Sequence, residues 1–254
     1  MISLLGNLSY DLLPGQPPRV GGGPFHAARA LALQSGPVRI YGRCADEDRD
    51  SLFAPLVQLG TPAEFVAGES TATFAFSYAG DRREMEIAAL GDVWQPVDVP
   101  TLRGVTWVHV APLARSDFPR PTIETIASQA RVALDGQGLV RAAKVGPLEL
   151  NAEYDPELLR HVSVLKLSDE EAAILGDPAG LGVPEVLVTH GSRGATVYAD
   201  GTVEQVESES IDTDPTGAGD AFCISYVVGR AEGLEPLAAA QRACAIVSEL
   251  LRVS

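Results

Sequence analysis

The 254-residue sequence lacks the features that mark membrane-spanning and secreted chains. No apolar run approaches the ~20 residues that a helix needs to cross a bilayer, and the start of the chain has neither the length nor the basic flank of a secretory signal. The three cysteines show no even pairing and no metal-site spacing. We therefore expect reduced thiols in a cytoplasmic protein.

Basic charge is also scarce. Nineteen Lys and Arg residues stand against 34 Asp and Glu residues, which gives a formal net charge of −15. This balance argues against nucleic acid or an anionic membrane as a partner, because both require a basic patch. A nucleotide stays open as a ligand, since a phosphate site is built locally from backbone amides, a helix N-terminus, a metal ion and one or two cations.

Several common catalytic motifs are absent. The chain contains no G-x-x-x-x-G-K-[ST] P-loop, no H-E-x-x-H metal motif and no G-x-S-x-G nucleophile elbow. Gly21-Gly22-Gly23 does not complete a G-x-G-x-x-G fingerprint, because His26 stands at the last glycine position. The sequence thus argues against a P-loop site, a zincin-type metal centre and a Rossmann dinucleotide site.

What the sequence does contain is an alternation of apolar strands and helices, in a chain long enough for one large domain over residues 1–254. The expected strands are 2–5, 38–41, 105–110, 131–134, 162–167, 185–189, 195–198 and 203–206. The expected helices are 27–34, 48–59, 169–175, 218–230 and 237–251. This alternation predicts an α/β fold, a mostly parallel sheet covered by helices on both faces, with the ligand at the carboxyl ends of the strands.

The segment 64–90 departs from that rhythm. Apolar residues alternate with small or polar ones on both sides of a Gly80-Asp81 turn signal, a pattern typical of a β-hairpin. The alternating residues are Phe74, Phe76 and Tyr78 before the turn, and Met85 and Ile87 after it. We expect a small β flap that stands off the main sheet.

The run from Asp212 to Phe222, D-T-D-P-T-G-A-G-D-A-F, carries the strongest chemical signal. Its Gly-Ala-Gly segment allows several backbone amides to point into one concavity, and it opens directly into an apolar helix. The helix N-terminus adds free amides and the positive end of its dipole, which predicts an anion hole. Asp220 in the first turn would repel phosphate, so we expect it to accept a proton from a neutral hydroxyl. Read alone, G-A-G-D is also compatible with a tight turn and a helix start.

These eleven residues resemble the D-T-x-G-A-G-D-x-F signature of the ribokinase-like (PfkB) family of sugar and nucleoside kinases, with one extra residue around Pro215. The resemblance implies a three-layer αβα domain with a small β lid. It implies transfer of the γ-phosphoryl group of ATP, with Mg²⁺, to a hydroxyl of a sugar or polyol. Asp220 would be the catalytic base, and the amides of Gly217, Ala218 and Gly219 would stabilise charge on the transferred group.

Two further segments resemble the part of the family that binds the acceptor. The run Gly6 to Asp11 is similar to the end of the first strand, where the resemblance implies that Asp11 binds acceptor hydroxyls. Gly22 and Gly23 resemble the N-terminal di-glycine, where the backbone approaches the acceptor, and the hairpin 64–90 stands in the position of the lid. The family's usual Asn after the di-glycine is missing. His26 is a candidate substitute, or else a packed helix residue.

Three segments resemble the part that binds the donor. Lys166 to Glu171 is similar to N-x-x-E, with Ser168 in place of Asn and Glu171 as the residue that organises Mg²⁺ and phosphate. Thr189, Gly191 and Gly194 match T-x-G-x-x-G, which lines the nucleotide site. The run D-x-Q-G-x-x-R, 135–141, resembles a variant of the inositol-kinase-like branch.

Arg141 at the end of that run has the paired donors that clamp a phosphate, although a surface arginine after a turn gives the same pattern. The D-x-Q-G-x-x-R run and the missing Asn favour a cyclic polyol acceptor, such as an inositol, over ribose. A nucleoside kinase of the same fold and a sugar-binding regulatory relative without turnover are the alternatives. The partners expected are a small sugar or polyol, with no nucleic acid and no membrane, and a homodimer is one option for the assembly.

Overall fold

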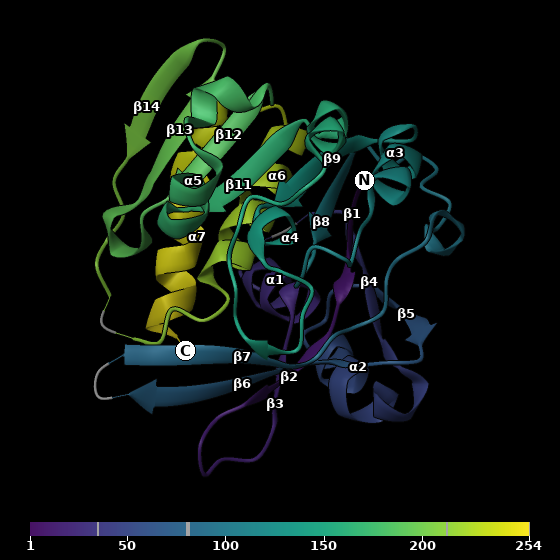
Figure 1. Ribbon diagram of the computed structural model, residues 1–254. Coiled ribbons are helices and arrows are strands. Elements are labelled where there is room, and N and C mark those ends of the chain that lie inside the picture. Colours follow the sequence, from purple (N-terminus) through teal and green to yellow (C-terminus); the bar gives the residue numbers. More distant parts are fainter. Residues whose placement is uncertain (35, 80–81, 212, 254) are drawn as a thin grey trace.

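A computed structural model describes residues 1–254 apart from 35, 80–81, 212 and 254 (Figure 1). Its main sheet has nine strands in the order β14-β13-β12-β11-β9-β8-β1-β4-β5. Neighbours from β12 through β5 are parallel, and β13 and β14 pair antiparallel at one edge. The predicted mostly parallel sheet is confirmed. In chain order the strands are β1 (Ile2–Asn7), β4 (Val38–Ala45), β5 (Ala63–Gly68), β8 (Trp107–Ala111), β9 (Arg131–Asp135), β11 (Val164–Ser168), β12 (Glu185–Thr189), β13 (Ala195–Ala199) and β14 (Thr202–Val206).

Helices cover both faces of this sheet because its central strands are apolar on both sides. Successive residues of one strand enter different cores. Val164 packs in a cluster with residues of α1, α2, α6 and α7, whereas Leu165 packs with residues of α3, α4 and α5 on the opposite face. The result is the predicted three-layer arrangement (Figure 1). The helices are α1 (Gly23–Leu31), α2 (Arg49–Gln58), α3 (Arg120–Ala127), α4 (Gln137–Val140), α5 (Asp169–Leu175), α6 (Ala218–Ala231) and α7 (Pro236–Arg252).

A second sheet of five strands, in the order β10-β7-β6-β2-β3, crosses one end of the main sheet and forms the lid (Figure 1). Its strands are β2 (Ser9–Leu12), β3 (Arg19–Gly21), β6 (Ala72–Ala79), β7 (Arg82–Ala89) and β10 (Gly146–Pro147). A small apolar cluster joins it to the loop after β8 through Phe74, Ile87 and Leu113.

The lid differs from the expected hairpin in two ways. Residues 63–68 do not belong to it, because they form β5 and pair in parallel with β4 in the main sheet. The chain closes α2 at Gly60 and continues the strand–helix rhythm for one more strand. The lid also recruits β2, β3 and β10, which are too short to show a pattern in the sequence. The expected Gly80-Asp81 turn lies outside the described residues.

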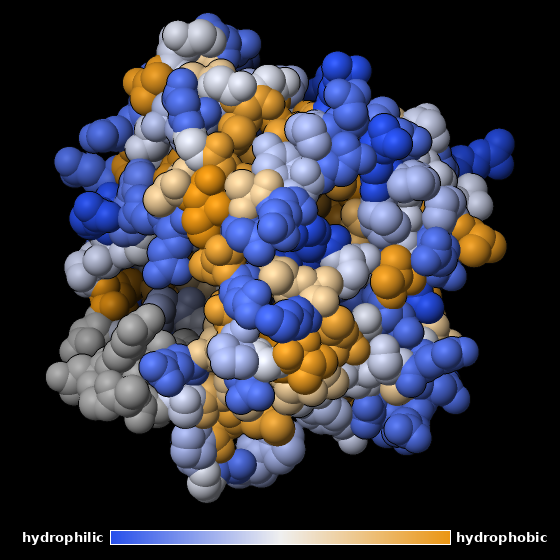
Figure 2. All heavy atoms as spheres, viewed as in Figure 1, coloured by the Kyte–Doolittle hydropathy of each residue, from blue (hydrophilic) through white to orange (hydrophobic). Residues whose placement is uncertain are grey.

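Polar side chains cover most of the face shown in Figure 2, and apolar residues show through where the lid meets the main sheet. Among the described residues, no helix combines the length and apolar character that a membrane span requires. Cys44, Cys223 and Cys244 are buried free thiols.

Candidate active site

Two adjoining cavities lie at the carboxyl ends of the main-sheet strands. The larger, of about 640 Å³, is lined by the ends of β9, β11 and β12 and by α7. The smaller, of about 190 Å³, lies between the lid and the amino end of α1. The two share five lining residues: Met85, Gln137, Arg141, Gly217 and Asp220. The start of α6 therefore stands where the contents of the two cavities would meet.

The amino end of α6 carries the amides of the expected anion hole. Gly217 caps it with a left-handed backbone, φ +82°, and a Cβ there would come within 2.2 Å of His26 Nδ1. The amide of Ala218 donates to the carbonyl of Pro215 at 2.9 Å, whereas the amides of Gly217, Gly219 and Asp220 have no backbone acceptor among the described residues. Of the three amides that the sequence predicts for the hole, that of Ala218 is therefore engaged, and the amide of Asp220 joins those of Gly217 and Gly219 as one without a backbone acceptor in the described part of the chain. Asp212, the first residue of the motif, lies outside the described residues.

Asp220 lines both cavities at this junction. Its Oδ1 is shielded from solvent and has no hydrogen-bond partner in the described part of the chain. It lies against Gly23, where a Cβ would approach it to 3.0 Å. Burial, reinforced by Asp135 and opposed by Lys166, raises the pKa of Asp220 to about 7. Such a carboxylate is suited to accept a proton near neutral pH.

Asp11 and the di-glycine line the smaller cavity, as the sequence predicts. Asp11 lies on β2 in the lid sheet, and its Oδ1 accepts a hydrogen bond from Ser9 Oγ at 3.3 Å. Gly22 is the N-cap of α1 with φ +92°, and a Cβ there would meet the carbonyl oxygen of Asn7 at 2.4 Å. A Cβ on Gly23 would meet that of Ala111 at 2.4 Å. The close backbone approach explains both glycines.

His26 lies beneath the anion hole. It is buried on α1 against Gly217, and its Nδ1 has no partner among the residues described. Burial, aided by the charge of Arg29, lowers the pKa of His26 to about 4, so the ring is neutral at pH 7. A neutral ring at the edge of the smaller cavity can exchange a hydrogen bond with a hydroxyl but supplies no charge.

The predicted donor-site residues line the larger cavity. Ser168 and Glu171 form a capping box at the start of α5: the Glu171 amide donates to Ser168 Oγ at 3.2 Å, and the Ser168 amide donates to Glu171 Oε2 at 2.8 Å. The second carboxylate oxygen of Glu171, Oε1, takes no part in this capping box. Thr189 Oγ1 donates to the carbonyl of Leu167 at 3.1 Å. Gly191 and Gly194 have φ of +58° and +97° on the loop after β12.

Arg141 reaches both cavities. It follows α4, lines each cavity, and its guanidinium lies 6.0 Å from the ring centroid of Phe74 in the lid. The reading of Arg141 as an ordinary surface residue is therefore disfavoured. Gln137 of the same D-x-Q-G-x-x-R run is buried and also faces both cavities.

Sequence reasoning missed the ion pair beside the anion hole. Lys166 Nζ lies 3.2 Å from Asp135 Oδ2, and both side chains are buried. Asp135 opens the D-x-Q-G-x-x-R run and Lys166 stands two residues before Ser168 of the N-x-x-E-like run, but neither residue was assigned a role from the sequence. The available signal was their position, since charged residues at the carboxyl ends of apolar parallel strands face the ligand.

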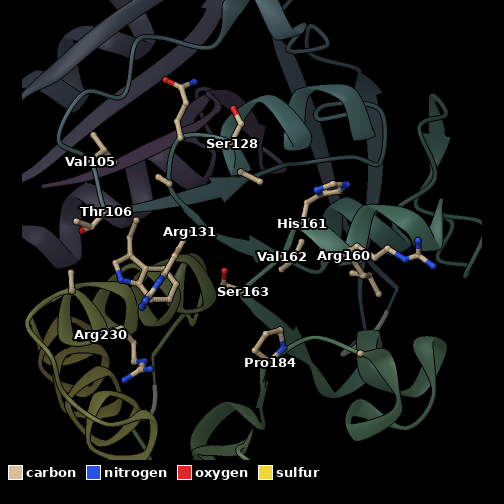
Figure 3. Close-up of a pocket in the computed structure, with 17 residues that line it drawn as sticks. Val105, Thr106, Ser128, Arg131, Arg160, His161, Val162, Ser163, Pro184 and Arg230 are labelled. Carbon is tan, nitrogen blue, oxygen red and sulfur yellow. The ribbon is translucent and has the colours of Figure 1, made fainter.

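A broader hollow, of about 950 Å³, lies at the opposite edge of the sheet, where β8, β9 and β11 begin (Figure 3). Of its three arginines, Arg160 and Arg230 pair with Glu157 and Glu185, and the Arg131 guanidinium lies 5.4 Å from the ring centroid of Trp107. Helices α3 and α6 end there, so the negative ends of their dipoles face it. This hollow is poorly suited to phosphate, and the reactive groups lie at the other edge.

Comparison with known proteins agrees with the geometry. The family described as pfkB family carbohydrate kinase matches residues 19–252. Inositol 3-kinase of Zea mays is 29% identical over 79% of this chain and 53% of its own length. Inositol 3-kinase of Oryza sativa is 30% identical over 85% of this chain and 55% of its own. The chain thus spans about half the length of these relatives.

A solved structure shows the same fold. A pyrophosphate-dependent kinase of the ribokinase family, in complex with a pyrophosphate analogue and myo-inositol, superposes with a TM-score of 0.86 at 24% identity. The match covers 99% of this chain and 95% of that one. The three-layer αβα fold with a β lid is therefore ribokinase-like.

Proposed function

The chain belongs to the pfkB family of carbohydrate kinases, and we propose that it transfers the γ-phosphoryl group of ATP to a hydroxyl of a small cyclic polyol. The observation that carries the proposal is the position of Asp220 and the α6 amides at the junction of two cavities of unequal size. Phosphoryl transfer depends on positioning and charge stabilisation, and both are provided there. Comparing turnover across sugars, cyclic polyols and nucleosides tests the proposal.

The smaller cavity favours a compact acceptor. Its volume of about 190 Å³ is below the roughly 300–1,000 Å³ of pockets for drug-sized ligands, so it suits one polyol ring better than a nucleoside. Asp11 and Ser9 supply oxygen atoms on the lid side, and Arg141 supplies guanidinium donors. The curated names of the maize and rice relatives also favour an inositol-like acceptor.

The larger cavity is proposed to hold the donor. Thr189, Gly191 and Gly194 line one wall, and apolar residues of α7, among them Val247 and Leu251, provide a surface for a base. Pyrophosphate is a second candidate, supported by the dependence named for the structural relative. Measuring turnover with ATP and with pyrophosphate at equal donor concentrations separates the two candidates.

Mg²⁺ is the metal that this donor site fits. No group of three or more His, Cys, Asp or Glu side chains in the described part of the chain forms a ready metal cage. Mg²⁺ commonly takes one or two carboxylates plus substrate phosphates, which is what Glu171 in the larger cavity offers. When bound, Mg²⁺ would neutralise part of the charge on the donor phosphates.

In the proposed reaction the acceptor hydroxyl lies in the smaller cavity beside the Asp220 carboxylate and gives up its proton to that carboxylate. The acceptor oxygen bonds to the terminal phosphorus of the donor while the bond from that phosphorus to the leaving oxygen breaks. The amides of Gly217, Gly219 and Asp220 stabilise the negative charge on the transferred group. Arg141, which lines both cavities, offers further donors.

Asp11→Ala should raise the acceptor KM, because the variant loses carboxylate oxygens that accept hydrogen bonds from acceptor hydroxyls. We expect an increase on the order of tenfold or more, from hydrogen bonds to a charged group worth roughly 1.5–3 kcal/mol. The donor KM should change little. Steady-state kinetics with each substrate varied in turn provide the measurement, and an unchanged acceptor KM would show that Asp11 is only a structural residue of the lid sheet.

Glu171→Ala should raise the Mg²⁺ concentration needed for half-maximal turnover and slow catalysis, with little change in acceptor KM. Part of the effect could arise from the lost capping box, which the Glu171→Gln variant keeps. A Mg²⁺ titration of both variants at fixed donor concentration makes the distinction. If both curves match that of the parent, Glu171 serves α5 and not the metal.

Turnover should rise with pH through about 7, because protonated Asp220 cannot accept the acceptor proton. Asp135→Asn removes a negative charge that raises the pKa of Asp220, so the midpoint of the rise should move to lower pH. Profiles of kcat/KM from pH 5.5 to 9 measure both effects. A flat parent profile, or a shift to higher pH in the variant, would contradict the assignment.

We place the protein in the cytoplasm, in keeping with its three free thiols. The homodimer stays a prediction, for which sedimentation analysis is the direct measurement. A sugar-binding relative without turnover is disfavoured by the intact Asp220, Glu171 and anion hole.

A further inference from the structure

Lysine is rare in this chain. Of the 19 basic residues, Lys144 and Lys166 are the two lysines, and the rest are arginines. The Lys144 side chain is 67% exposed and pairs with Glu149 on the surface. The Lys166 side chain is 7% exposed and lines the larger cavity. One lysine is therefore an ordinary surface residue, and the other lies in the site.

Lys166 lies directly against the anion hole. A Cβ built on Gly219 would come within 2.7 Å of Lys166 Nζ and 3.3 Å of its Cε, so the ammonium touches the backbone at the middle of the hole. The planar fork of an arginine would need more room than this contact leaves, whereas an ammonium is a compact point charge. The rare use of lysine here has a steric reason.

The ammonium retains hydrogen-bonding capacity. It has three N–H donors, and in the described part of the chain its contacts go to one carboxylate, Asp135, at 3.2 and 3.4 Å. A buried ion pair with such long contacts is poor compensation for removing two charges from water. Stabilisation of the fold alone does not account for the pair.

The local balance of charges also favours a role for Lys166 in binding an anion. Three carboxylates, those of Asp135, Glu171 and Asp220, surround two cations, Lys166 and Arg141. Burial alone would lower the pKa of Lys166, but the three carboxylates together raise it, so the ammonium stays protonated at neutral pH. An incoming phosphoryl group would meet an acidic surrounding in which the Lys166 ammonium lies against Gly219 of the hole.

We propose that Lys166 contacts the phosphoryl group during transfer, adding a fixed positive charge to the anion hole, and that Asp135 holds the ammonium in place. The inference rests on the proposed kinase function. It makes the hole a composite of α6 amides and one side-chain cation from β11. Negative charge that develops on the transferred group would be offset most strongly at this point, because the pair is shielded from water.

Lys166→Met keeps the length of the side chain and removes its charge. We expect kcat to fall on the order of 10²–10³-fold, as for the loss of one oxyanion-hole donor, with the acceptor KM little changed. Lys144→Met is the matched control and should leave kcat unchanged. Lys166→Met leaves Asp135 buried without its partner and so lowers stability. The thermal unfolding of each variant is therefore measured together with its kinetics.

The double variant Asp135→Asn/Lys166→Met separates the two explanations. It removes both charges, so it should unfold closer to the parent temperature than Lys166→Met does. If Lys166 contacts the phosphoryl group, kcat of the double variant stays reduced on the order of 10²-fold. If kcat returns to within a few-fold of the parent, Lys166 only neutralises Asp135 and the proposal is overturned.

Binding of an anion to Lys166 can be measured by NMR without turnover. Protein labelled with ¹⁵N-lysine gives two Nζ resonances, which the Met variants assign. Titration with pyrophosphate, without metal, should shift the Lys166 resonance and leave that of Lys144 in place. A Lys166 resonance unmoved up to millimolar pyrophosphate would contradict the inference. If the resonance shifts but no acceptor on the panel is phosphorylated, the anion contact stands and the proposed function fails.

Discussion

Asp220→Asn is expected to lower turnover on the order of 10²-fold or more, because the amide keeps the size of the side chain but cannot accept the acceptor proton. Nucleotide affinity should change much less, since the α6 amides and the lining of the larger cavity stay intact. Single-turnover kinetics combined with calorimetric titration of the donor measure the two quantities separately. Turnover near that of the parent would remove Asp220 as the base.

The same variant has an expected signature in stability. The pKa of Asp220 is raised from 3.8 to about 7 by folding, so the native state binds the proton more tightly than the unfolded chain does. The stability from this group is complete below about pH 3.8 and is lost as the pH rises through about 7. Asp220→Asn should therefore unfold at a higher temperature than the parent at pH 8, and the difference should shrink at pH 5. Asp200→Asn, the same change on a surface turn, should alter neither turnover nor this pH dependence.

Gly217→Ala is expected to reduce kcat on the order of 10²–10³-fold by displacing the anion hole. The added Cβ would lie 2.2 Å from His26 Nδ1 and 2.7 Å from His26 Cβ. His26 is buried on α1 and cannot move aside freely, so the start of α6 has to shift. The positive φ of +82° adds backbone strain of roughly 1–3 kcal/mol.

Gly60→Ala is the matched control for this effect. Gly60 has nearly the same φ, +84°, and a Cβ there would have no atom within 4 Å. This variant should lose a similar amount of backbone stability while keeping the kcat of the parent. Thermal unfolding and steady-state kinetics of the two variants separate the effect of the steric clash with His26 from the effect of backbone strain. Equal kcat values for Gly217→Ala and the parent would show that the hole tolerates displacement and is not the transfer site.

The sequence predicted the elements whose stability is local. The predicted strand 185–189 and helix 169–175 match β12 and α5, which an apolar run and, in the structure, a local Ser168–Glu171 capping box stabilise. The short lid strands β2, β3 and β10 were not predicted. They contain two to four residues and exist through pairing with partners distant in the sequence, which no local pattern records.

The candidate site shows the same limit. The motif around Asp220 and Gly217 is contiguous, and its positions in the fold follow from the chain order of a parallel sheet. The contacts of Gly23 with Asp220, His26 with Gly217 and Lys166 with Gly219 join segments that are far apart in the sequence. Each depends on how α1, β11 and α6 pack, so Gly23, His26, Gly217, Gly219 and Asp220 could be named in advance but their pairing could not, and Lys166 was not named at all.

The most direct test of the central claim is detection of the product by ³¹P NMR. The purified chain is incubated with Mg²⁺, with ATP or pyrophosphate, and with cyclic polyols, hexoses, ribose and adenosine in separate samples. The account predicts a new phosphomonoester resonance that is strongest with a cyclic polyol, at a yield matching donor consumption, and that is absent with Asp220→Asn. Donor hydrolysis to inorganic phosphate without any phosphomonoester, or equal product formation by the Asp220→Asn variant, would contradict it.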